Sequence, residues 1–263
     1  MLRPTTFPGG ITATIADAPQ GDRPRLLFIH GMFGGAWQFE EWQLHMARRG
    51  YSSVAVDLRS QSGISPAADG GAISLHDYVA AALRVARELG RPAVIGHSMG
   101  GLVAQKLAEE DAVSAVVLIC SAPPRWISVL SGSLLTRLLK YAPELLTSRP
   151  IVAGRADADA LFLNRVPLAE RYRIFERIGP ESGRAARELA LGALAVDASR
   201  VRCPMLSVGA GDDRFLPPRI ARAIAKKYDC EYREYAGHGH YIIGEPDWER
   251  VADDVAGWIA AHC

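Results

Sequence analysis

Cysteine is scarce in this 263-residue sequence. The four cysteines are Cys120, Cys203, Cys230 and Cys263; no two of them form a C-x-x-C pair, and no histidine stands beside them at a zinc-ligand spacing. This pattern argues against a disulfide framework and against a structural zinc site. It suits a reducing compartment, so we expect a cytoplasmic protein.

Long hydrophobic runs and an excess of charge of one sign are also missing. No stretch approaches the roughly 18 consecutive apolar residues of a membrane-spanning helix, and residues 1–10 contain no signal-peptide core. Lys and Arg number 30 and Asp and Glu number 29, which leaves a net charge of +1. No global field would attract nucleic acid or an anionic membrane, so we expect neither as a partner.

What is present is an alternation of short apolar runs with longer amphipathic segments, typical of βα units around a parallel sheet. The apolar runs that predict strands are Leu26–Ile29, Ser53–Val56, Ala93–Ile95, Ala115–Ile119 and Met205–Val208, and a sixth strand is expected at Glu231–Tyr235. The segments that predict helices are Trp37–Arg49, Leu75–Leu89, Gly101–Glu109, Arg219–Lys227 and Trp248–Ala261. The sequence therefore predicts an α/β fold with a mostly parallel central sheet flanked by helices.

The rhythm changes between Pro124 and Arg200. Apolar residues recur there at helical spacing, and no convincing strand pattern interrupts them. The predicted helices are Leu130–Tyr141, Leu168–Ile178 and Arg184–Leu194. We expect a helical insertion between two strands of the sheet.

The strongest local motif is Gly96-His97-Ser98-Met99-Gly100, which follows one predicted strand and precedes a predicted helix. In a nucleophile elbow the serine backbone is strained and neighbouring segments pass close to it, so small residues are needed two positions before and after it. Gly96 and Gly100 meet this need. Such a turn lifts the Ser98 hydroxyl clear of the sheet at a helix N-terminus, where negative charge is favoured. The alternative is a purely structural turn; we predict a nucleophile.

A serine hydroxyl becomes a nucleophile when a histidine takes its proton and a carboxylate orients that histidine. Asp212 and Asp213 directly follow the fifth predicted strand, and His238 and His240 follow the sixth. Both loops lie at the carboxyl ends of strands, where α/β sheets bind their ligands. We favour His240 as the base, and from position alone either aspartate could serve.

An oxyanion needs two backbone N–H groups. The glycine-rich segment His30-Gly31-Met32 follows the first predicted strand and can fold over the elbow. Met32 and Met99 would then donate their N–H groups, and their side chains would form pocket wall. We expect His30 to be a structural, hydrogen-bonding histidine.

These motifs carry a resemblance to a known family that extends over nearly the whole chain. The matching pieces are His30-Gly31 with Trp37, Asp57-Leu58-Arg59, the elbow Gly96–Gly101, the turn Asp213–Pro217 and His240 with Glu245. Together they resemble the α/β-hydrolase superfamily.

The resemblance implies which of the paired candidates act. In many members the acid stands four residues before a proline, which points to Asp213 because Pro217 follows it at that distance. The histidine is typically preceded by glycine and followed five residues later by glutamate, a pattern that His240 meets with Gly239 and Glu245. The family also implies a helical cap over the active site. We expect a hydrolase core of residues 1–124 and 200–263 and a cap of residues 125–199.

A serine in the elbow argues against the dehalogenase and epoxide hydrolase branches of the superfamily, which place aspartate there. We expect a serine carboxylesterase that acts on a small-molecule ester, of small to medium size and hydrophobic, through Ser98, His240 and Asp213. No metal or organic cofactor is expected. The alternatives are a carbon–carbon, lactone or thioester hydrolase, an acyltransferase, or a ligand-binding receptor of the same fold. Apolar residues of the insertion are candidates to line the pocket: Trp126, Leu134, Leu138, Tyr141, Phe162 and Phe175.

Overall fold

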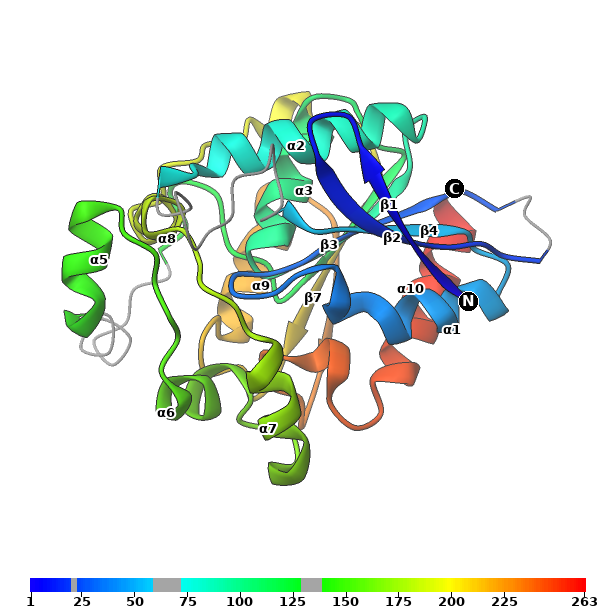
Figure 1. Ribbon diagram of the computed structural model, residues 1–263. Coiled ribbons are helices and arrows are strands. Elements are labelled where there is room, and N and C mark those ends of the chain that lie inside the picture. The colour runs from blue at the N-terminus through cyan, green and yellow to red at the C-terminus, as the bar shows by residue number, and fades with distance from the viewer. Residues whose placement is uncertain (20–22, 59–71, 129–138) are drawn as a thin grey trace.

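The computed structural model describes residues 1–19, 23–58, 72–128 and 139–263 (Figure 1). In these residues eight strands form one sheet in the order β1-β2-β4-β3-β5-β6-β7-β8. The β1–β2 and β2–β4 pairs are antiparallel, and all other neighbours are parallel. The strands are β1 (Leu2–Phe7), β2 (Ile11–Ala16), β3 (Leu26–Ile29), β4 (Ser53–Val56), β5 (Ala93–His97), β6 (Ala115–Ile119), β7 (Met205–Ala210) and β8 (Glu231–Tyr235).

The six predicted strands are all present, and β5 and β7 each extend two residues further than predicted. The antiparallel hairpin β1–β2 at the edge of the sheet was not predicted. Its strands are rich in threonine, and in β2 the buried Ile11 and Ala13 flank the exposed Thr12. A search for continuous apolar runs overlooks strands with one solvated face, whose apolar residues alternate with polar ones.

Helices cover both faces of the sheet because successive strand residues point to opposite sides. Leu27 and Ile29 of β3 pack in the core beneath α2, α3 and α9, whereas Leu26 and Phe28 pack beneath α1 and α10. Figure 1 shows these two helical layers on either side of the strands. The helices are α1 (Glu40–Arg48), α2 (Leu75–Glu88), α3 (Met99–Glu109), α9 (Pro218–Tyr228) and α10 (Trp248–His262), with the short 3-10 helices η1 (Ala36–Phe39) and η7 (Ile242–Gly244).

The chain between β6 and β7, which we call the β6–β7 segment, is helical where it is described. In Figure 1 its helices α5, α6, α7 and α8 lie along the left and lower border. One isolated bridge, between Ile151 and Glu181, joins two of its parts. The predicted helix 130–141 lies largely outside the described residues; Leu139–Tyr141 forms a single 3-10 turn. The elements are η4 (Leu139–Tyr141), α5 (Ala142–Thr147), α6 (Arg155–Asp157), the π-helical η5 (Ala158–Phe162), α7 (Leu168–Arg177), α8 (Gly183–Ala190) and the 3-10 helix η6 (Ala198–Arg200).

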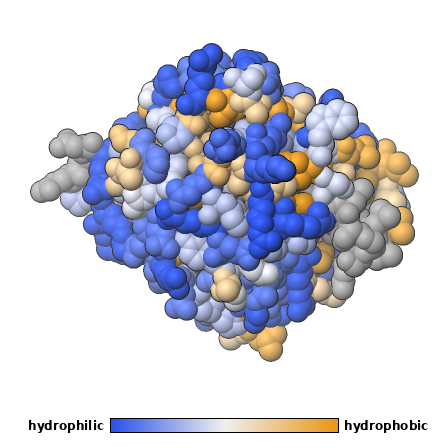
Figure 2. Space-filling view, turned by 180° about the vertical axis from the view of Figure 1, so that it is seen from behind, coloured by the Kyte–Doolittle hydropathy of each residue, from blue (hydrophilic) through white to orange (hydrophobic). Residues whose placement is uncertain are grey.

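Exposed apolar side chains concentrate in the β6–β7 segment. Figure 2 shows a largely hydrophilic face on which hydrophobic residues gather at the right edge. Apart from Met1, the large exposed hydrophobic residues among those described are Trp126, Leu139, Leu146, Val152, Leu168, Tyr172 and Leu191. In the described part of the chain, no helix combines the length and apolar character needed to cross a membrane.

Candidate active site

Ser98 occupies a sharp turn between β5 and α3. Its backbone has φ 53° and ψ −119°, a conformation that is strained for a residue with a side chain. The two flanking glycines permit the turn. A Cβ on Gly96 would stand 2.4 Å from the carbonyl oxygen of Gly100, and one on Gly100 would stand 2.2 Å from that of Ile29. Since real Cβ atoms do not approach this closely, the small-residue requirement predicted for the elbow has a steric basis here.

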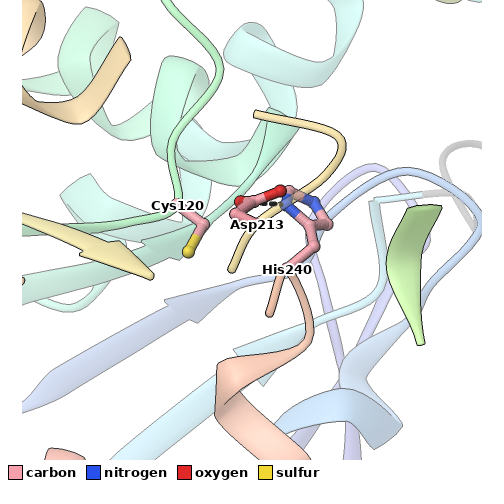
Figure 3. Close-up of side chains that lie close together, drawn as sticks. All are labelled: Cys120, Asp213 and His240. Atoms are coloured by element: carbon pink, nitrogen blue, oxygen red, sulfur yellow. Dashed lines mark hydrogen bonds and ion pairs between the residues drawn. The ribbon is translucent and has the colours of Figure 1, made fainter. Parts of the chain in front are cut away.

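Three side chains from separate loops meet at this turn. Nε2 of His240 lies 3.0 Å from Oγ of Ser98, and Nδ1 of His240 lies 2.8 Å from Oδ2 of Asp213. Figure 3 shows the second of these hydrogen bonds. Ser98, Asp213 and His240 are exposed by only 4%, 4% and 3%, so water competes little for these contacts. The sequence predicted this trio, and the fold brings it together.

The neighbouring aspartate is placed differently. Oδ1 of Asp213 accepts hydrogen bonds from the backbone N–H groups of Phe215 and Leu216, both at 2.8 Å, which fixes the carboxylate toward His240. The side chain of Asp212 points to the surface and forms an ion pair with Arg165. Geometry therefore selects Asp213 of the two carboxylates that follow β7.

The neighbouring histidine is also turned away from the nucleophile. Nδ1 of His238 lies 3.2 Å from Oε2 of Glu245, not beside Ser98. Burial lowers the pKa of His238 below its ordinary value. Of the two histidines in this loop, His240 is therefore the one placed to accept a proton from the serine.

The two N–H groups predicted to hold an oxyanion belong to residues beside the nucleophile. Met99 is the first residue of α3, so its N–H is among those at a helix N-terminus that have no acceptor within the helix. Gly31 precedes Met32 and lies against the serine, since a Cβ on Gly31 would stand 3.0 Å from Cβ of Ser98. This arrangement brings both backbone segments to the Ser98 hydroxyl.

Glu181 of the β6–β7 segment supports this loop and was not singled out in the sequence. Its side chain is buried and accepts on both oxygens: Oε1 from the Tyr78 hydroxyl at 2.6 Å and the Ser182 N–H at 2.8 Å, and Oε2 from the Phe33 N–H at 3.0 Å. A glutamate in a polar stretch carries no local signal of such a role, because the partners come from distant parts of the chain.

His97 is a second residue whose part the sequence did not reveal. Nε2 of His97 donates to the backbone carbonyl of His240 at 2.9 Å, and its Nδ1 is buried without a partner among the described residues. Burial, together with the nearby His240, lowers the pKa of His97 to about 3, so the ring is neutral at working pH. It ties the elbow to the His240 loop. His30 is a structural histidine as expected, with Nε2 accepting from the Leu58 N–H at 3.0 Å.

Comparison with known proteins bears directly on this geometry. The alpha/beta hydrolase family matches residues 26–254. The chain belongs to this family. It is 26% identical to a monoacylglycerol lipase of Mycolicibacterium smegmatis over 175 residues, which cover 64% of this chain and 62% of the lipase. It is 27% identical to phospholipase YtpA of Bacillus subtilis over 258 residues, which cover 88% and 94%. A soluble variant of the monoglyceride lipase of Saccharomyces cerevisiae superposes with a TM-score of 0.79 at 19% identity, over 100% of this chain and 96% of that one.

The described residues of this α/β hydrolase line one cavity at the nucleophile and a second cavity that shares part of its wall. The first, which we call the catalytic pocket, contains Ser98 and His240 and includes Trp37, Gln38 and Ile178. The second, the apolar pocket, encloses about 840 Å³ including the part open to solvent. The residues common to both walls are Met32, Phe33, Phe162 and Phe215. The two cavities therefore adjoin, separated by aromatic and methionine side chains.

Of the pocket residues predicted from the sequence, some line a cavity and others do not. Tyr141 and Phe162 line the apolar pocket, and the Tyr141 hydroxyl also donates to Oδ2 of Asp157 at 2.7 Å. Phe175 packs against the core beneath α1 and α10 and lines neither cavity. Trp126 is 90% exposed and lies away from both, a correction to the expectation that helical spacing suggested. Leu134 and Leu138 lie outside the described residues.

Cys120 directly follows β6 and lies beside the acid and the base (Figure 3). Its Sγ and the ligand atoms of Asp213 and His240 lie within 4.8 Å of one another, the arrangement nearest to a metal site among the described residues. Burial and the charge of Asp213 raise the pKa of the thiol well above its ordinary value. A metal requires the thiolate, so this chemistry fits a neutral thiol beside a carboxylate–imidazole pair.

Proposed function

We propose that this α/β hydrolase is a serine carboxylesterase whose triad is Ser98, His240 and Asp213. The observation that carries the proposal is the unbroken hydrogen-bonded line from the Ser98 hydroxyl through the imidazole to the Asp213 carboxylate, placed against an apolar pocket. The nucleophile, the base and the group that orients the base stand in the order that acyl transfer requires. The lipase and phospholipase relatives agree with ester chemistry.

In the proposed first step His240 accepts the Ser98 proton on Nε2, and Oγ attacks the ester carbonyl carbon. The N–H groups of Met32 and Met99 donate to the oxyanion of the tetrahedral intermediate. Asp213 keeps the proton of the imidazole on Nδ1 and stabilises the imidazolium that forms. The intermediate collapses when the bond to the leaving oxygen breaks, and His240 gives its proton to the departing alcohol.

In the proposed second step water replaces the alcohol. His240 removes a proton from a water molecule, whose oxygen attacks the acyl carbon of the Ser98 ester. A second tetrahedral intermediate collapses to the free acid, and Ser98 recovers its proton from the imidazolium. Only side chains, backbone N–H groups and water take part in this scheme.

The β6–β7 segment acts in this proposal as a cap that selects the substrate. Phe162 supports this role because its ring lies 4.7 Å from the Phe215 ring and 5.9 Å from the His240 ring, centroid to centroid. A chain bound in the apolar pocket would therefore run past the base. The predominantly apolar lining favours small to medium hydrophobic esters over charged ones.

The test is hydrolysis of p-nitrophenyl esters from acetate to dodecanoate, combined with labelling by a fluorophosphonate. Ser98→Ala should abolish both turnover and labelling. Ser114→Ala serves as the matched control, because Ser114 immediately precedes β6 and lies at the opposite end of the sheet from the site. We expect the control to match the wild type in turnover and in labelling. The acyl-chain length that is hydrolysed fastest should correspond to the size of the apolar pocket.

The same experiment separates the alternatives. Labelling of Ser98 without ester turnover would replace the proposal by a carbon–carbon, lactone or thioester hydrolase. A new ester formed when a second alcohol is added would identify an acyltransferase. Absence of both labelling and turnover would leave a ligand-binding protein of hydrolase fold.

A further inference from the structure

Glu245, which follows the His240 loop, is a carboxyl group with an asymmetric environment. The residue is only 1% exposed. Oε2 accepts from the Gly239 N–H at 2.8 Å and faces Nδ1 of His238 at 3.2 Å. Oε1 is buried and has no hydrogen-bond partner among the described residues. Oε2 thus accepts a hydrogen bond as a carbonyl oxygen would, whereas Oε1 has no hydrogen-bond donor among the described residues.

A second isolated acceptor lies at the same place. Oδ1 of Asn164 is also buried without a partner in the described part of the chain. The amide orientation is set by Nδ2, which donates to the carbonyl of Asp212 at 3.0 Å. A Cβ built on Gly239 would stand 2.7 Å from Oδ1 of Asn164 and 3.0 Å from Oε1 of Glu245, so the two oxygens flank one point.

Two buried oxygens without a donor are costly, because each loses its hydration without compensation. Rotating the Asn164 amide would not help, since Oδ1 would then face the Asp212 carbonyl. A single proton on Oε1 supplies the missing donor. We propose that the Glu245 carboxyl carries a proton in the folded protein and that its Oε1 hydroxyl donates to Oδ1 of Asn164.

The charges around Glu245 support the neutral form. Burial is the main influence and raises the pKa of Glu245 to about 7, and the negative charge of Asp213 acts in the same direction. The Gly239 N–H and the Arg165 guanidinium oppose the shift, as does His240 when its imidazole carries a second proton, but they do not cancel it. His238, which faces Oε2, has a lowered pKa and adds little positive charge.

The resulting bond would act as a brace between two loops. Asn164 would hold the acid loop through the Asp212 carbonyl and the base loop through Glu245, which itself holds the Gly239 N–H next to His240. Asn164 and Glu245 are therefore positioning residues that set the distance between Asp213 and the imidazole. This catalytic consequence rests on the proposed function, whereas the protonation of Glu245 does not.

The first test measures stability and needs no substrate. Glutamine is an uncharged isostere that offers a donor to Asn164 and an acceptor to Gly239, so Glu245→Gln should be insensitive to the titration. Because the carboxyl pKa rises from 4.5 to about 7 on folding, the wild type should lose stability relative to the variant between these pH values. The ratio of the variant's folding equilibrium constant to that of the wild type should rise by roughly 10²-fold across this window and stay constant above it.

Glu181→Gln is the matched control, because both Glu181 oxygens already accept hydrogen bonds and an amide would face a donor there. Glu181→Gln should be less stable than the wild type at neutral pH, whereas Glu245→Gln should gain stability relative to the wild type as the pH rises to 7. Infrared spectra of the wild type minus Glu245→Gln should show a protonated carboxylic acid band at pH 6 that disappears by pH 9. A carboxylate band at pH 6, or a Glu245→Gln variant that is destabilised at every pH, would overturn the inference.

The second test addresses positioning in the working enzyme. Glu245→Gln should keep kcat for p-nitrophenyl butyrate within about threefold of the wild type and remove the part of the alkaline decline that follows Glu245 ionisation. Glu245→Leu should lower kcat by about tenfold or more with little change in KM. Equal kcat values for the Gln and Leu variants would contradict the brace. Absence of turnover in every variant, with the stability result intact, would refute the proposed function and leave the protonated glutamate standing.

Discussion

Replacing Asp213 by asparagine probes the line of hydrogen bonds at the site with almost no change in shape. Oδ1 of Asp213 accepts from the Phe215 and Leu216 N–H groups, so the asparagine oxygen should take that position and its NH₂ should face Nδ1 of His240. An NH₂ group donates, so it favours the imidazole tautomer whose proton is on Nε2. That proton would point at the Ser98 hydroxyl, and the base would be lost.

The size of the effect follows from what the amide must give up to restore the working tautomer. Turning its oxygen toward His240 leaves two buried N–H groups unpaired, at about 1–3 kcal/mol each and thus about 2–6 kcal/mol together. The variant also loses the charge that stabilises the imidazolium. The corresponding change in serine proteases lowers kcat about 10⁴-fold, equivalent to about 5 kcal/mol, which lies within this range. We expect a loss of that order in kcat/KM.

The assay is hydrolysis of p-nitrophenyl butyrate by Asp213→Asn and Asp212→Asn side by side, with the urea midpoint of each as a check on folding. Asp212 is ion-paired with Arg165 at the surface, and exposed pairs contribute about 0–1 kcal/mol. Asp212→Asn should therefore keep activity within a few-fold of the wild type. If Asp212→Asn were the more impaired variant, or both lost activity equally, the assignment of the acid would be wrong.

Three other substitutions, two of them with a matched control, test the packing, the electrostatics and the specificity of the site. Gly100→Ala should lower stability in urea by about 3 kcal/mol or more because its Cβ would overlap the Ile29 carbonyl, whereas Gly257→Ala in α10 meets nothing within 4 Å and should be neutral or up to about 1 kcal/mol stabilising. The pKa of His97 falls from 6.5 to about 3 on folding. Its contribution to the free energy of unfolding is therefore complete above pH 6.5 and is lost as the pH falls toward 3. From pH 7 to pH 5 the free energy of unfolding of the wild type should fall by about 2 kcal/mol more than that of His97→Gln. Phe162→Ala should raise the octanoate-to-butyrate ratio of kcat/KM about tenfold by widening the passage between the two cavities, and Phe175→Ala should leave it unchanged.

The central strands β3 to β7 could be predicted because they are buried on both faces and appear in the sequence as short apolar runs. The edge hairpin β1–β2 could not, since alternation over six residues with threonines is a weak signal. At the site, Ser98, Asp213 and His240 could be found because the elbow has a steric signature and the other two follow strands. Trp126 shows the limit of the same reasoning: helical spacing indicates which residues share a face but not what that face covers.

The residues that the sequence could not reveal share one property, which is that their partners are remote in the chain. His97 holds the His240 carbonyl, and Glu181 holds the loop of the Met32 N–H. Glu245 was matched to the family pattern, but its position facing an amide 81 positions earlier was not. Burial decides whether such groups are charged, and no local pattern encodes it.

These contacts divide the site into two parts of different rigidity. His240 is held on three sides: by Asp213 at Nδ1, by His97 at its carbonyl, and through the Gly239 N–H by Glu245. On the substrate side, among the described residues, the rings of Phe162 and Phe215 pack against each other through a contact without directional hydrogen bonds. Hydrogen bonds hold an angle that van der Waals contacts do not, so substitutions in the aromatic wall can change which acyl group fits while the base keeps its place. Selectivity in this hydrolase should therefore vary more readily than the geometry of the triad.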